Sequence, residues 1–86
     1  MPDLFTFQDE SKSYARYRIY KIPSRPNARI TVEQCKSIRS GEWEAAEVSW
    51  SAPSAATREM AEETAAALLH AAQTARQWDI EKGISE

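Results

Sequence analysis

The sequence predicts an α+β fold: a three-stranded antiparallel meander, with or without an extra N-terminal edge strand, packed by one long C-terminal α-helix. Three observations predict it. The 86 residues suffice for one domain. Residues 14–50 are rich in β-branched and aromatic residues and carry Pro and Gly turn signals. Residues 55–82 contain no Gly or Pro and are dominated by strong helix formers.

The N-terminal segment, residues 1–12, carries the alternating apolar stretch Leu4-Phe5-Thr6-Phe7 inside a polar frame. Such a segment is expected to form either a short edge strand or a loose arm. The remaining residues, 13–86, are expected to form the single α+β domain.

Three strands are predicted, over about residues 14–22, 29–39 and 43–50. The segment from Pro23 to Asn27 ends the first, because two prolines remove hydrogen-bond donors and Asn tolerates turn geometry. Ser40-Gly41 separates the second from the third. In the first strand, alternation predicts a core face of Ala15, Tyr17 and Ile19.

A helix is predicted over about residues 55–82, with Ser54 or Thr57 as its N-cap and Lys82-Gly83 as its stop. Its predicted buried stripe consists mostly of small residues, which allow close packing. A helix of about 26 residues is ~39 Å long, whereas strands of 8–9 residues span ~28 Å. We therefore expect the helix to overhang its sheet and, together with a thin core, to favour dimerisation through the helix. The core candidates are Tyr17, Ile19, Ile30, Val32, Val48, Trp50, Met60, Leu68, Ala72 and Trp78.

Composition narrows the classes of function. Leu, Ile, Val and Phe number 13 of 86 residues, below the roughly 20% usual in folded domains, so the core is small and a dimer or bound partner is favoured. A single cysteine excludes an intramolecular disulfide framework and a multi-cysteine zinc site. No apolar run approaches the ~18 residues of a membrane span. We expect a cytoplasmic protein without a cofactor.

Charge is segregated along the chain. Residues 12–41 carry a net charge of +7, whereas residues 1–11 carry −3 and residues 42–86 carry −6. Such asymmetry is typical of a surface that binds a polyanion. It is equally typical of a protein whose two halves, or two copies, attract each other.

The predicted first strand offers a candidate binding face. Alternation places Tyr14, Arg16, Arg18 and Tyr20 on one side of this strand. The two guanidinium groups could bind the phosphates of a nucleic acid, and the two phenol rings could stack on its bases. Four further basic residues extend this hypothetical face: Arg25, Arg29, Lys36 and Arg39. The leading interpretation is a small non-enzymatic binding protein that acts through protein–protein contacts as a homodimer or on a protein partner. The alternative is nucleic-acid binding through this basic and aromatic face.

Catalytic and metal-binding patterns are weak. His70 is the one histidine, and Glu63 precedes it by seven residues, about 10.5 Å along a helix axis, too far for a shared metal ion. His70 is therefore predicted to be solvent-exposed. Cys35 lacks an obvious base and is predicted to pack in or beside the second strand. We expect no metal site and no enzymatic activity.

Two resemblances accompany this interpretation. The predicted order of three strands and a helix, over roughly residues 14–80, resembles the end of the double-stranded-RNA-binding domain and the arm-binding domains of phage integrases. The acidic helix start from Thr57 to Glu63 departs from the basic cluster of that RNA-binding domain. Glu47-Val-Ser-Trp-Ser51, followed by an alanine-rich helix with Ala65-Ala-Ala-Leu-Leu69, resembles the C-terminal halves of small proteins of actinobacteria and their phages. This second resemblance covers residues 47–75 and implies no assigned activity.

Overall fold

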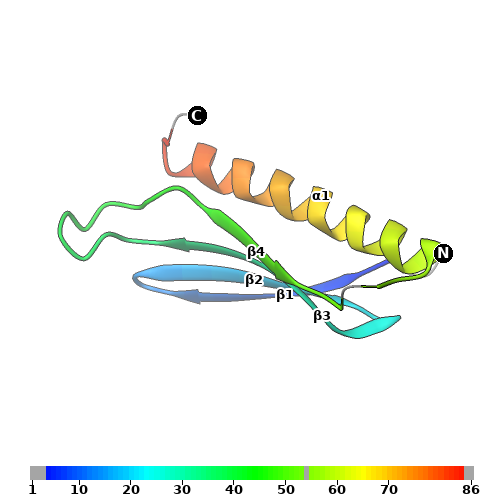
Figure 1. The fold of residues 1–86 in the computed structure, drawn as a ribbon. Helices are drawn as coiled ribbons and strands as arrows, with labels where there is room; N and C mark the ends of the chain where they lie inside the picture. The colour runs from blue at the N-terminus through cyan, green and yellow to red at the C-terminus, as the bar shows by residue number, and fades with distance from the viewer. Residues whose placement is uncertain (1–3, 54, 85–86) are drawn as a thin grey trace.

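A four-stranded antiparallel meander lies against one long helix (Figure 1). The computed structural model describes residues 4–53 and 55–84. The strands are β1 (Thr6–Lys12), β2 (Ala15–Ile22), β3 (Arg25–Cys35) and β4 (Glu47–Ser51), in the spatial order β1-β2-β3-β4. The helix α1 (Arg58–Glu81) packs across one face of the sheet. The predicted fold class is confirmed.

The N-terminal segment forms an edge strand rather than a loose arm. β1 pairs with β2 from Thr6 opposite Lys21 to Lys12 opposite Ala15. All seven residues of β1 are exposed, as expected at the rim of a sheet.

The β2–β3 turn is shorter than predicted. Only Pro23 and Ser24 form it, and Pro26 lies inside β3 beside a register irregularity after Lys21. Proline is tolerated at such an irregularity because the ladder hydrogen bond is already interrupted there. β3 therefore covers residues 25–35 instead of 29–39, and β4 covers 47–51 instead of 43–50.

The helix begins and ends close to the predicted positions. The Thr57 hydroxyl accepts a hydrogen bond from the Met60 N–H at 3.2 Å, which confirms Thr57 as the N-cap. The other candidate, Ser54, lies outside the described residues. At the other end, Gly83 adopts a φ of 70°, a left-handed conformation that glycine accommodates without a steric penalty.

The predicted overhang of the helix is wrong. β3 is 11 residues long, or about 36 Å, and the 24 residues of α1 span about the same length. The helix therefore runs along a strand of its own length (Figure 1), and helix length no longer favours dimerisation.

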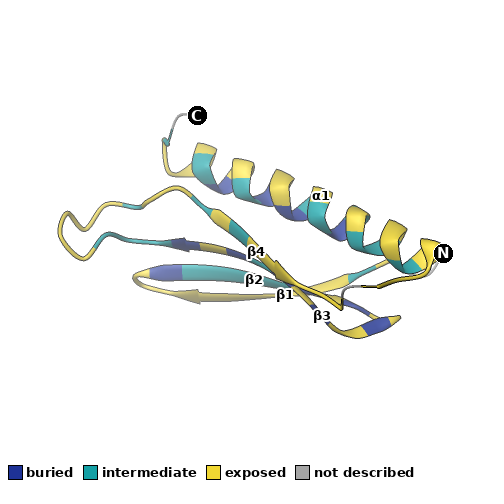
Figure 2. Ribbon diagram, in the orientation of Figure 1, coloured by how far each residue is buried: buried dark blue, intermediate teal, exposed yellow. Residues whose placement is uncertain are grey.

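The core lies between the inner side of α1 and the helix-facing side of β2 and β3 (Figure 2). Ile30, Val32 and Trp78 are buried as predicted, and Val48 and Leu68 pack against them. Small residues Ala67 and Ala71 let the helix approach the sheet closely. The hydrophobic core cluster also contains residues that were not among the core candidates: Tyr20, Ile22, Ala28, Ala67 and Ala71.

Several core predictions are wrong. Tyr17 and Ile19 lie on the sheet face away from the helix, because β2 turns Arg16, Arg18 and Tyr20 toward α1.

Three further core candidates, in β4 and α1, are not buried. Trp50 is 63% exposed at the β4 edge. Ala72 is exposed and Met60 only half-buried, because the buried stripe of α1 runs through Ala67, Ala71, Thr74 and Trp78 instead.

Candidate functional site

The predicted basic and aromatic residues do not form one exposed face. Arg16, Arg18 and Tyr20 point under the helix, and Arg25 is 7% exposed. Tyr14 and Arg39 are exposed in turns, and Lys36 is half-buried beside Trp43. Arg29 is exposed on the sheet face that points away from the helix. The structure therefore separates the predicted set into internal and external groups.

Arg16 anchors the C-terminal end of the helix. Its guanidinium donates to Oε1 of Gln34 at 3.0 Å and to the carbonyl oxygen of Trp78 at 3.2 Å. The same group lies 4.3 Å from the Trp78 ring centroid, a cation–π contact, and pairs with Glu81 at 3.3 Å. Each of the three guanidinium nitrogens thus makes a hydrogen bond within the described chain.

Arg18 is equally engaged. It donates to both carboxylate oxygens of Asp9, at 2.6 and 2.9 Å, and to the Thr74 hydroxyl at 3.2 Å. Its guanidinium also covers the Phe7 ring at 4.2 Å. The hydrogen bonds from Arg18 lower the pKa of Asp9, and the same bonds raise the pKa of Arg18. The arrangement ties the edge strand β1 to β2 and α1.

Gln34 links the segment between β3 and β4 to the helix. It is 1% exposed, and its amide donates to the Glu44 carbonyl at 3.0 Å and to Oδ1 of Asp79 at 3.2 Å. The same Asp79 oxygen accepts from the Ala46 N–H at 2.8 Å. Among the described residues, no buried side-chain nitrogen or oxygen lacks a hydrogen-bond partner. The polar groups under the helix are thus matched to one another.

His70 belongs to an aromatic cluster, so its predicted solvent exposure is wrong. Its Nδ1 shares a 2.7 Å hydrogen bond with the Tyr20 hydroxyl, which also hydrogen-bonds Thr74 at 3.0 Å. The rings of Phe5 and Phe7 lie 5.2 and 5.6 Å from the His70 ring. A cavity of about 490 Å³ opens beside them, lined by Leu4, Phe5, Thr6, Phe7 and His70. The apolar alternation of residues 4–7 was the only sequence signal for this cluster.

The opposite face of the sheet, which we call the open face, is not covered by any described element (Figure 1). Strand pairing arranges its side chains in rows that cross the sheet. A basic row consists of Thr6, Lys21, Arg29 and Ser51; a central row consists of Gln8, Ile19, Thr31 and Ser49; an acidic row consists of Glu10, Tyr17, Glu33 and Glu47. Lys12, Ala15 and Cys35 follow beyond the acidic row.

The central row of the open face has one apolar residue, Ile19, among polar neighbours, and the two ends of the face carry opposite charge. Tyr17, Ile19 and Thr31 are half-buried among their neighbours, whereas the charged side chains of the basic and acidic rows are exposed. Successive rows are two residues apart, or ~7 Å, so the basic and acidic rows are ~14 Å apart. Strand alternation alone does not reveal this surface, because it places Tyr17 and Ile19 in the core.

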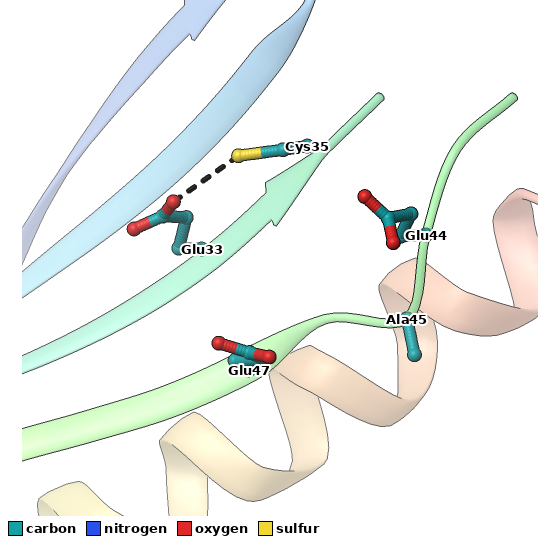
Figure 3. A pocket seen from close by; sticks show the side chains of 5 residues that line it. All are labelled: Glu33, Cys35, Glu44, Ala45 and Glu47. Atoms are coloured by element: carbon teal, nitrogen blue, oxygen red, sulfur yellow. Dashed lines mark hydrogen bonds between the residues drawn. The ribbon is translucent and has the colours of Figure 1, made fainter. Parts of the chain in front are cut away.

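A hollow of about 320 Å³ lies at the acidic end of this face, lined by Glu33, Cys35, Glu44, Ala45 and Glu47 (Figure 3). The Cys35 thiol donates to Oε1 of Glu33 at 3.1 Å. This hydrogen bond, followed by burial and the nearby carboxylates, raises the pKa of Cys35. The thiol is thereby held in its less nucleophilic, protonated form. Cys35 lies at the end of β3, in the strand position expected for it.

The described residues contain no group of three or more His, Cys, Asp or Glu side chains that could hold a metal ion. Within the same part of the chain, no helix is long and apolar enough to cross a membrane. Comparison with known protein families, with curated proteins and with solved structures finds no match to this chain. The resemblance of residues 47–75 to actinobacterial and phage proteins stays a prediction.

Proposed function

We propose that this chain is a small non-enzymatic binding protein that holds a protein partner on the open face of its sheet. The observation that carries this proposal is the contrast between the two sheet faces. Helix α1 covers one face, and no buried side-chain nitrogen or oxygen of the described residues lacks a hydrogen-bond partner. The open face presents its half-buried centre, with Tyr17 and Ile19, to solvent.

The composition of the open face favours a protein as the ligand. Ile19 at the centre and the neighbouring Tyr17 are half-buried between charged ends, and apolar and aromatic residues inside a charged rim are the usual anatomy of a protein–protein interface. Opposite charges at its two ends, Arg29 on one side and Glu33 on the other, would fix the orientation of a partner.

The nucleic-acid alternative has less support. Arg16, Arg18 and Arg25 make internal hydrogen bonds, so they are poorly placed to contact phosphates. The exposed cations Lys21 and Arg29 share the open face with the acidic row, which repels a polyanion. The overall charge of −2 acts in the same direction.

A capture experiment tests the proposal. Immobilised wild-type protein, Ile19→Lys and Leu69→Lys are compared for the proteins they retain, including soluble copies of the chain itself. Leu69 is a matched control because it is an apolar residue, 62% exposed, on the helix. We expect Ile19→Lys to lose the captured protein and Leu69→Lys to keep it. Equal capture by all three variants, or no capture by any of them, would refute binding through the open face.

A further inference from the structure

We infer that the partner of the open face is a second copy of this chain, packed face to face about a two-fold axis that runs along the central row. This inference rests on the proposed function, since it assumes that the open face is the binding surface. The axis would cross the strands at the level of Ile19 and Thr31.

The order of the rows selects this axis. A two-fold axis along the central row exchanges the two ends of the face, so the basic row of one copy meets the acidic row of the other. Each strand then lies over the same strand of the second copy. An axis parallel to the strands would instead place like charges together, which is unfavourable.

The pairs that result are chemically complementary. Arg29 of each copy lies above Glu33 of the other, because both belong to β3 and stand one row on either side of the axis. Along β4, the Ser51 hydroxyl meets the Glu47 carboxylate. Along β2, Lys21 meets the ring of Tyr17, a cation–π arrangement. Every pair occurs twice, as in any isologous interface.

The hollow at the acidic end of the open face fits the same arrangement. The hollow bounded by Glu33, Glu44 and Glu47 lies at the acidic end of the face (Figure 3). Face-to-face sheets pack about 10 Å apart, a gap that an arginine and a glutamate side chain fill together. Arg29 of the second copy would place its guanidinium in this hollow, and Ile19 would meet its own equivalent at the centre.

The small size of the face indicates a weak interaction. Four strands ~4.8 Å apart and three rows ~7 Å apart cover on the order of 400 Å² in projection. This puts the interface at the low end of specific complexes. We therefore expect a weak dimer, with a dissociation constant on the order of micromolar, that weakens as salt screens its exposed ion pairs.

Charge reversal tests the geometry. Sedimentation velocity is recorded over a range of concentrations for the wild type, Arg29→Glu, Glu33→Arg and the chain carrying both changes. Each single variant places like charges opposite each other at both ends, so we expect at least a tenfold weaker dimer. An equimolar mixture of the two single variants restores opposite pairs at both ends, and so does the double variant. Both are expected to dimerise like the wild type.

Matched controls separate this effect from net charge. Arg58→Glu and Glu62→Arg make the same charge changes on α1, at an exposed pair, and are expected to leave the dimer unchanged. A wild type that stays monomeric, a mixture that does not dimerise, or a dimer disrupted by the helix variants would overturn the inference. If the wild type is monomeric but retains another protein through Ile19, the second copy is the wrong partner and the proposed function stands. If no capture occurs either, both fail.

Discussion

The guanidinium of Arg18 and the carboxylate of Asp9 form a two-point ion pair between β2 and β1, with nitrogen–oxygen distances of 2.6 and 2.9 Å. The same guanidinium reaches the Thr74 hydroxyl of α1. One side chain therefore joins the edge strand, the inner strand and the helix.

Loss of this ion pair should make the protein less sensitive to acid. The pKa of Asp9 lies below its ordinary value of 3.8 because Arg18 donates to the carboxylate. The ion pair therefore stabilises the folded state fully at pH values above 3.8, and this stabilisation is lost as the pH falls through the lowered pKa of Asp9. Asp9→Asn should cost about 0.5–1 kcal/mol at neutral pH, since the carboxylate is half exposed. It should then lose less stability than the wild type between about pH 5 and pH 3.

Urea unfolding at both pH values measures the effect. Glu10→Gln is the matched control, because Glu10 adjoins Asp9 in β1 but faces the open side of the sheet. A control variant that changes the pH dependence as much as Asp9→Asn would contradict this role for the ion pair.

Removal of the Tyr20 hydroxyl should destabilise the fold. Tyr20 is buried, and its hydroxyl hydrogen-bonds both His70 and Thr74. Tyr20→Phe leaves these two groups with an unmet hydrogen bond, which costs about 1–3 kcal/mol. Tyr14→Phe is the control because Tyr14 is 57% exposed, and it should change the free energy of unfolding by less than ~0.5 kcal/mol. Equal effects in the two variants would argue against the internal network.

Arg25 should be a structural arginine rather than a ligand-binding one. It donates to the Pro53 carbonyl at 2.9 Å and to the Thr64 hydroxyl at 3.2 Å, and so joins the start of β3 both to the segment before α1 and to α1 itself. Arg25→Ala should lower the free energy of unfolding by about 2–3 kcal/mol, because partially buried acceptors lose a charged donor. The exposed Arg29→Ala is the control, measured in dilute solution, and should have little effect. A stable Arg25→Ala variant would refute this assignment.

Cys35 should react slowly with iodoacetamide. The hydrogen bond to Glu33 raises the pKa of the thiol, so less thiolate is present at a given pH. Glu33→Gln removes the negative charge and should speed alkylation at mildly alkaline pH, measured by mass spectrometry in dilute solution. The control Glu62→Gln lies on α1 and should alkylate like the wild type. An unchanged rate in Glu33→Gln would contradict the role of Glu33.

The fold was predictable because its signals are local. Pro23 marks the end of β2, Gly41 marks the connection between β3 and β4, and the unbroken helical segment after Thr57 marks α1. The N-terminal strand was left open because Phe5 and Phe7 gain their partners, Tyr20 and His70, only through tertiary packing.

The orientation of β2 could not be read from local pattern. Both of its faces carry apolar residues, Tyr17 and Ile19 on one and Tyr20 and Ile22 on the other. A shift of the strand register by one residue turns every side chain of β2 to the other face of the sheet. The outcome depends on partners distant in sequence, since Gln34 and Thr74 satisfy the arginines that turn inward. Within β2, the residues predicted to contact nucleic acid and the residues of the open face thus lie on opposite sides of the strand.

Self-association through the open face is measured by following the methyl signals of Ile19, Leu69 and Ile80 by NMR while the wild-type protein is concentrated from dilute solution. Ile19 lies at the centre of the open face, whereas Leu69 and Ile80 are exposed on the helix. We predict that the Ile19 signal shifts with concentration while those of Leu69 and Ile80 stay in place. Movement of the helix signals with a constant Ile19 signal would contradict the assignment of the open face as the contact surface.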